Sequence, residues 1–182
     1  MKEIKIRRVE RRDLDGCFLL EKRCYDLLEV APRDFIEKRI EIYPDGFYVA
    51  EYMGEIVGMV NSGATHKDDI TDEELKYLIG HVRNGRNGVV FSLAVHPDHR
   101  GRGIAGMLME KLIDSAEQKE KQKILLLCRD SLIDFYKSLG FSYSGPASAR
   151  LGADVLHQMH FELPLPAWIA ASHHNSTSPA LQ

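Results

Sequence analysis

The spacing of apolar side chains predicts the elements of the first half of the chain. Residues 3–9 alternate between apolar and charged positions, as a half-buried strand does. Residues 12–26 and 31–43 place apolar side chains three and four apart, which is typical of amphipathic helices. Residues 46–52 and 55–63 are two β-rich runs joined by two residues that end in glycine, a hairpin pattern. We therefore expect a strand, two helices and the antiparallel start of a sheet.

The second half of the chain predicts a β-α-β unit over residues 88–128. In its helix, expected over about 101–119, apolar side chains recur four apart on one face, at Ile104, Leu108, Leu112 and Ala116. Residues 124–128 form a continuous apolar run, as in a parallel strand that is covered on both faces. The pattern then predicts three more elements, namely a short helix over 131–139, a strand at 141–143 and a last strand over 155–163.

Length, charge and cysteine content narrow the class of protein. The 182 residues suit one domain, expected over 1–163, followed by an extension over 164–182. A formal charge of −3, from 24 basic and 27 acidic residues, gives no overall field for nucleic acid or a membrane surface. No apolar run reaches the length of a membrane span, and the three cysteines form no C-x-x-C pair. We expect a cytoplasmic protein with no nucleic-acid or membrane partner.

A glycine-rich turn between the apolar strand that ends at Val95 and the following helix suggests an anion site. Glycines at 101, 103 and 106 remove side chains where a ligand must approach the backbone. The first helical N–H groups have no partner within the helix, and they lie at the positive end of the helix dipole. A P-loop is excluded, because no Lys-Ser/Thr pair follows these glycines. The dinucleotide pattern G-x-G-x-x-G is present, but no acidic residue follows at the expected distance.

The run Arg100-x-x-Gly103-x-Ala105, directly after a strand and a proline turn, resembles the acetyl-CoA signature of the GNAT superfamily of N-acetyltransferases. The resemblance implies an α/β fold with a central twisted mixed β-sheet flanked by helices on both faces. It also implies acetyl-CoA as cosubstrate, with no metal, and a primary amine as acceptor. The residues implied in holding coenzyme A are Leu93, Ala94, Val95, Arg100, Gly101, Arg102, Gly103, Ile104, Ala105, Gly106 and Tyr136.

Acetyl transfer needs a proton donor for the leaving thiolate and hydrogen bonds to the thioester carbonyl. Tyr136 lies in Phe135-Tyr136-x-x-x-Gly140-Phe141, which resembles the Tyr-x-x-x-Gly-Phe element of GNAT enzymes, so it is assigned as general acid. The alternative is that Tyr136 packs as an ordinary aromatic side chain. A bulge that separates the strand ending at Val95 from the strand ending at Cys128 would free N–H groups, and by resemblance Val95 is the expected donor.

Three runs narrow the resemblance to the serotonin (arylalkylamine) N-acetyltransferases: residues 93–96, 127–136 and 144–146. Vertebrate members of that branch carry two histidines at the positions of Val89 and Phe91, so the residue that deprotonates the amine must differ here. Glu21 matches a family glutamate that faces the pocket and is the first candidate for a catalytic base. Ser92 or an ordered water are substitutes. The alternative reading of Glu21, followed by a lysine and an arginine, is a solvated helix face.

The resemblance predicts acetyl transfer to a small, arylalkylamine-like primary amine by direct attack in a ternary complex. Two rival functions share the same glycine-rich turn. One is acetylation of a protein N-terminus or lysine side chain, which requires an open peptide groove. The other is a CoA-binding sensor with little turnover, which the absence of the histidine pair suggests. A homodimer is compatible with the sequence.

Overall fold

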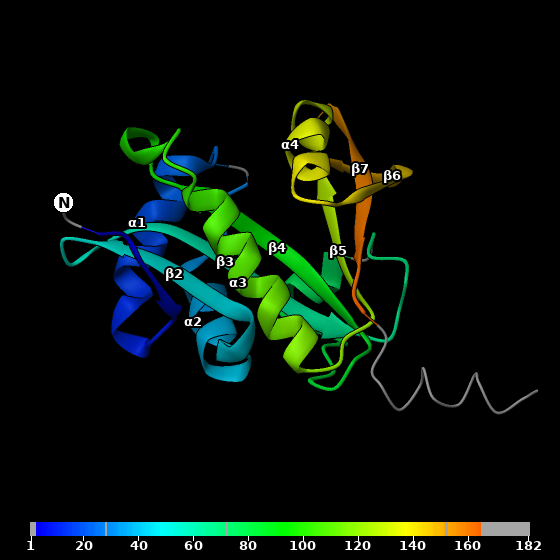
Figure 1. Ribbon diagram of the computed structural model, residues 1–182, viewed down its shortest axis with the longest axis horizontal. Coiled ribbons are helices and arrows are strands. Elements are labelled where there is room, and N and C mark those ends of the chain that lie inside the picture. The colour runs from blue at the N-terminus through cyan, green and yellow to red at the C-terminus, as the bar shows by residue number, and fades with distance from the viewer. Residues whose placement is uncertain (1–2, 28, 72, 152, 165–182) are drawn as a thin grey trace, which may run out of the picture.

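The computed structural model of the protein describes residues 3–27, 29–71, 73–151 and 153–164 (Figure 1). Its helices and strands follow one another in the order β1 (Lys5–Arg8), α1 (Leu14–Cys24), α2 (Arg33–Ile42), β2 (Phe47–Tyr52), β3 (Glu55–Thr65), β4 (Asn87–Val95), α3 (Ile104–Gln118), β5 (Lys123–Cys128), α4 (Ile133–Ser138), β6 (Ser142–Leu151) and β7 (Asp154–Glu162). Short 3-10 helices precede α1, β2 and α4 and lie before and after β4, at Arg11–Asp13, Pro44–Gly46, Asp130–Leu132, Glu73–Tyr77 and Pro97–His99.

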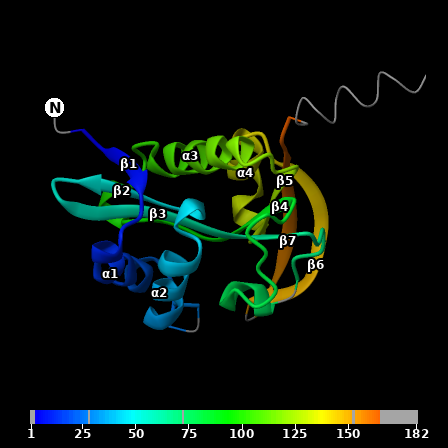
Figure 2. The ribbon, with the colours of Figure 1, turned by 90° about the horizontal axis from the view of Figure 1, so that it is seen from below.

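The strands form one seven-stranded mixed sheet in the order β1-β2-β3-β4-β5-β7-β6. Only the β4–β5 pair is parallel among these neighbours, and the others are antiparallel. Figure 2 shows α1 and α2 on one face of the sheet and α3 and α4 on the other. The expected mixed α/β fold, with its β-α-β unit from β4 to β5, is therefore confirmed.

Each face of the sheet is closed by an apolar cluster. On the α3 side the four predicted positions are all buried, with exposed fractions of 1, 0, 4 and 7% for Ile104, Leu108, Leu112 and Ala116. On the other side Cys17 and Leu20 of α1 and Ile36 of α2 pack against β2 and β3. Burial of these stripes, more than helix propensity, holds the helices against the sheet.

Two predicted boundaries differ from the structure by three residues or more. The helix expected from Gly101 begins at Ile104, because Gly101 and Gly103 adopt φ angles of 74° and 75°, which do not continue a helix. The strand expected at 141–143 runs on to Leu151, paired with β7. The extension expected over 164–182 lies outside the described residues from 165 onward. Among the residues described, no helix is long and apolar enough to cross a membrane.

Strands β4 and β5 separate after only four paired positions. Pairing runs from Asn87 with Lys123 to Val90 with Leu126, and it stops there, although β4 continues to Val95. At the same place Asn61 of β3 pairs with Ser92 while Ser62 pairs with Val90, so Phe91 is an extra residue on β4. Such a bulge bends its strand. The two strands diverge from this point in Figure 1, and the gap between them is the setting of the candidate site.

Candidate active site

The edge of β4 that faces the gap carries hydrogen-bonding groups without a strand partner. The N–H of His96 donates to the carbonyl of Val57, 2.9 Å away on β3. N–H directions alternate along a strand, so the N–H groups of Val95 and Leu93 point the other way, into the gap. The carbonyls on this edge accept hydrogen bonds from side chains. Leu93 O accepts from the Tyr25 hydroxyl at 2.9 Å, and Val95 O accepts from Arg100 Nε at 3.1 Å.

The turn after β4 presents bare backbone at the start of α3. Gly101 and Gly103 lie in the left-handed region, and a Cβ on either would meet nothing within 4 Å. Gly103 is the N-cap of α3 and supplies no side-chain hydrogen bond, so the first N–H groups of α3 have no cap. Ile104 turns its side chain into the core, with an exposed fraction of 1%. An anion placed here would meet unpartnered N–H groups at the positive end of a helix dipole.

The two arginines of this turn lie differently. Arg100 folds back onto the Val95 carbonyl at the edge of the gap. Arg102 leans the other way, with its guanidinium 4.8 Å from the centre of the Tyr52 ring and NH1 2.8 Å from His99 Nδ1. Both side chains are exposed, and the hydrogen bond of each engages a single guanidinium nitrogen.

Tyr136 reaches the site from α4, across the gap from β4. Its side chain is 6% exposed and packs edge-on against Phe135 and Phe141, with ring centres 5.0 and 5.7 Å apart. Burial raises the pKa of Tyr136, and the nearby Tyr25 and Cys128 raise it further. Among the residues that the structure describes, none makes a hydrogen bond with the Tyr136 hydroxyl. The phenol therefore keeps its proton at neutral pH and has it available for a ligand.

Glu21 is enclosed between α1 and β4. Its side chain is 3% exposed, so the alternative of a solvated helix face is wrong. Oε1 accepts from the Ala31 N–H and Oε2 from the Ser92 hydroxyl, each at 3.2 Å. Burial raises the pKa of Glu21, while these hydrogen bonds and the nearby Arg39 oppose the rise.

Tyr25 and Arg39 belong to the same buried group, and reasoning from the sequence did not find them. The Ser92 hydroxyl lies 3.1 Å from the Tyr25 hydroxyl, and burial raises the pKa of Tyr25 to about 12. Arg39 is 4% exposed and donates to Asn61 Oδ1 at 3.0 Å, with its guanidinium 5.0 Å from the centre of the Phe91 ring. The only available signal was spacing, because Tyr25 follows Glu21 by one helical turn.

The positions where arylalkylamine enzymes have histidines hold packed apolar side chains. Val89 is 4% exposed and belongs to a cluster with Ile70 and Leu125, and Phe91 packs against that cluster. Neither side chain can carry a proton. Among the described residues, no group of three His, Cys, Asp or Glu side chains is arranged to hold a metal ion.

An open strand edge beside a bare glycine turn at a helix N-terminus fits an extended ligand that carries a diphosphate, as an acyl-CoA does. Residues 14–141 match the acetyltransferase (GNAT) family, and the chain belongs to that family. It is thus an acetyltransferase of the GNAT type that depends on acetyl-CoA.

Of two curated relatives, one is named an acetyltransferase and the other a hydrolase. Acetyltransferase ECA0875 of Pectobacterium atrosepticum is 34% identical over 143 residues, which cover 76% of this chain and 87% of that protein. The probable hydrolase YhcX of Bacillus subtilis is 30% identical over 134 residues, 69% of this chain, so the chain spans about a quarter (26%) of that relative's length.

Two solved structures share the fold at low sequence identity. The loading GNATL domain of CurA from Lyngbya majuscula superposes with a TM-score of 0.80 at 16% identity, over 88% of this chain and 98% of that one. The structure of yncA from Salmonella typhimurium with its cofactor acetyl-CoA superposes with a TM-score of 0.65 at 20% identity, over 91% of this chain and 96% of that one.

Proposed function

We propose that the protein transfers the acetyl group of acetyl-CoA to a small primary amine, arylalkylamine-like in size, by direct attack in a ternary complex. One observation carries the proposal. Two buried groups that can hold or release a proton lie on different elements: Tyr136 on α4, and Glu21 on α1, where it is hydrogen-bonded to Ser92 in the part of β4 that has no β5 partner. A protein that only binds coenzyme A has no need of such a pair.

The residues present fit acetyl-CoA. The bare turn at Gly101 and Gly103, with the first N–H groups of α3, would hold the diphosphate, and the β4 edge from Leu93 to Val95 would pair with the pantetheine arm. When bound, acetyl-CoA supplies the acetyl group as an activated thioester. The Val95 N–H is the donor we expect at the thioester carbonyl, where negative charge develops as the amine attacks.

Glu21 and Ser92 would together take the proton of the attacking amine. Glu21 is too enclosed to touch an acceptor, but Ser92 Oγ, on the bulged strand, connects it with the gap. With Glu21 ionised, the serine hydroxyl donates to its carboxylate. When the serine accepts a proton from the amine, it passes its own proton to Glu21, whose raised pKa favours the neutral form. Ser92 can then donate to the Tyr25 oxygen instead, which lies 3.1 Å away.

Tyr136 would serve the leaving sulfur. Its hydroxyl is protonated at neutral pH and has no competing hydrogen bond among the described residues. As the C–N bond forms and the C–S bond breaks, the phenol donates to the sulfur and passes its proton to the thiolate. The step balances for a neutral amine: the nitrogen loses one proton to Ser92 and Glu21, and the sulfur gains one from Tyr136. An acceptor that arrives as an ammonium ion first gives its extra proton to solvent. After the transfer Glu21 releases its proton to solvent and Tyr136 takes one up, which restores the starting state.

The test is Tyr136→Phe, which removes only a hydroxyl that makes no hydrogen bond within the described fold. We expect thiol release in the presence of a small amine to fall about 10²- to 10⁴-fold in kcat, with coenzyme A affinity nearly unchanged. Tyr143→Phe is the matched control, because Tyr143 is 44% exposed on β6 and its loss should leave turnover intact.

Two outcomes would contradict the proposal. An equal loss of turnover and coenzyme A affinity in Tyr136→Phe would show that the tyrosine binds rather than acts as an acid. Tight coenzyme A binding by the unaltered protein, without turnover on arylalkylamines, polyamines or peptides, would replace the enzyme with a sensor.

A further inference from the structure

Arg129 joins three segments that are far apart in the sequence. It follows β5 directly, and its guanidinium pairs with Glu29, in the segment between α1 and α2, and with Asp154, the first residue of β7. Arg129 Nε lies 3.3 Å from Asp154 Oδ2. We call this trio, Glu29, Arg129 and Asp154, the clasp. Glu29 is 14% exposed and Arg129 is 40% exposed, so the contact between the first two members is partly shielded from water.

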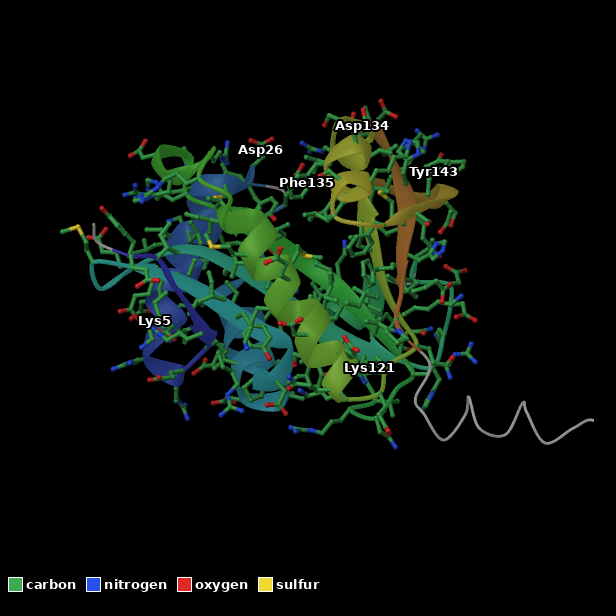
Figure 3. All side chains as sticks on the ribbon, viewed as in Figure 1. Lys5, Asp26, Lys121, Asp134, Phe135 and Tyr143 are labelled. Carbon is green, nitrogen blue, oxygen red and sulfur yellow. The ribbon has the colours of Figure 1, made fainter. Side chains whose placement is uncertain are left out.

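The clasp lies next to residues of the candidate site. Cys128, which precedes Arg129, is close enough to Tyr136 to raise its pKa. Tyr25, four residues before Glu29, contacts Leu93 O and the Ser92 hydroxyl. The clasp therefore connects the end of β5 with the segment after α1, which begins with Tyr25 and so lies near Ser92. In Figure 3 the labelled Asp26, just after α1, and Phe135, on α4, mark these two sides.

The charges of the clasp are unequal. Two carboxylates share one guanidinium, so the trio carries a net charge of −1 when all three groups are ionised. Of the three groups Glu29 is the most enclosed, so screening by salt is weaker at Glu29 than at the more exposed Asp154. A primary amine approaches as an ammonium ion, and a net negative rim favours its approach over that of an anion.

We propose that the clasp sets the acceptor class of the enzyme: it bridges the mouth of the site, admits small cationic amines and excludes an extended polypeptide. This inference rests on the proposed function, since it concerns the acceptor of the same reaction. Arg129 acts as a positioning residue, because it holds the segment after α1 and the start of β7 together and touches neither reacting atom. An extended chain would have to lie where the Arg129 side chain now crosses.

The experiment compares Arg129→Ala with Arg11→Ala, a matched control in which an arginine also pairs with two carboxylates, Glu37 and Glu41, on a different surface. The unaltered protein and both variants are assayed with a small arylalkylamine and with a short peptide that has a free N-terminus. For Arg129→Ala we expect the KM of the amine to rise about tenfold, kcat to change little, and the kcat/KM ratio of peptide to amine to increase about tenfold or more.

Glu29→Gln is the second variant, in case Arg129→Ala does not fold. It weakens the Glu29–Arg129 ion pair by removing the negative charge instead of the positive one. The kcat/KM ratio of peptide to amine should increase, as in Arg129→Ala. In all variants the KM of acetyl-CoA should stay unchanged, because the clasp lies away from the glycine turn. Arg11→Ala should match the unaltered protein in every one of these values.

The outcomes separate the two proposals. If the unaltered protein acetylates the amine and both clasp variants keep its peptide-to-amine ratio, the clasp is only a structural ion pair, and this inference is overturned while the proposed function stands. A lower melting temperature without a change in the ratio leads to the same conclusion. If the unaltered protein turns over the peptide better than any amine, the clasp does not exclude polypeptides. If it turns over neither, the proposed function falls, and the clasp's role in acceptor choice falls with it.

Discussion

Replacing Gly103 with alanine should destabilise the protein although there is room for the added methyl group. A Cβ at Gly103 would meet nothing within 4 Å, so no steric clash contributes. The cost comes from the backbone alone, because the residue has a φ of 75° and an L-amino acid in this region is strained by about 1–2 kcal/mol. For a chain of this size the melting temperature should fall by about 2–8 °C.

Gly106→Ala is the matched comparison three residues later. Gly106 is the third residue of α3, and a Cβ there would stand 3.8 Å from Leu139 Cδ2, an ordinary contact distance. Alanine is favoured over glycine by about 1 kcal/mol in a helix interior and by less in the first turn, so this variant should be more stable. The two substitutions are chemically identical and lie in one motif, yet their free energies of unfolding should differ by about 1–3 kcal/mol.

Thermal and urea unfolding of both variants, without ligand, measure this difference. A further variant, Gly103→Asn, should recover part of the loss, because asparagine tolerates left-handed backbone better than alanine does. The reasoning is refuted if the two alanine variants shift the melting temperature in the same direction by the same amount. That result would mean that the turn relaxes to a negative φ, and that the preformed anion site at the start of α3 does not depend on glycine.

Two further predictions concern groups around the site. Burial raises the pKa of Glu21 in the folded protein, so its contribution to stability is present below the unfolded pKa and is lost as pH rises through the folded pKa. Glu21→Gln should therefore gain stability relative to the unaltered protein between pH 4 and pH 8 in thermal unfolding, and a difference that does not vary with pH would contradict the raised pKa. Gly58→Ala would place a Cβ 2.8 Å from Ile104 Cγ2 and 3.1 Å from Leu108 Cδ1, so it should cost about 1–3 kcal/mol and weaken coenzyme A binding at the start of α3. Urea unfolding and titration with coenzyme A test this, and normal values for both would show that α3 can move away from β3 freely.

The parts of the fold that follow from local pattern were predictable. The stripe on α3 repeats every four residues, and the run over β5 is apolar throughout, so both elements and their order were expected and are found. The sequence also predicted the glycine turn, but it did not predict where the turn ends and α3 begins. Whether Gly101 and Gly103 belong to the helix depends on their φ angles, and a glycine can adopt either sign.

Parts of the fold that depend on distant partners were not predictable. Most of β6 is made of residues such as Gly145, Pro146 and Ser148, which have low β propensity. They form a strand because β7 lies beside them. The clasp is another example, because its three members are separated by 100 and 25 positions and no local pattern connects them.

Glu21 shows the same limit within the site. Its neighbours Lys22 and Arg23 suggest a solvated helix face, and the residue is nevertheless enclosed. The reason is long-range: a carboxylate can be buried if hydrogen bonds replace its water, and here Ala31 and Ser92 provide them. Resemblance to the arylalkylamine branch pointed to Glu21 as pocket-facing, whereas its contacts with Ser92 and Tyr25 became visible only in the folded chain.

Burial acts on Tyr136 and Glu21 in the same direction, yet it suits them to opposite tasks. It raises the pKa of both, because the charged form of each loses water. A phenol starts far above neutral pH, so the shift keeps Tyr136 protonated. A carboxyl starts well below neutral pH, so the shift makes Glu21 a stronger proton acceptor while ionised. In the proposed mechanism the thiolate of coenzyme A would be penalised by burial in the same way, so the raised pKa of Tyr136 need not prevent proton transfer to the sulfur. The two residues would then act as proton donor and proton acceptor without the histidine pair.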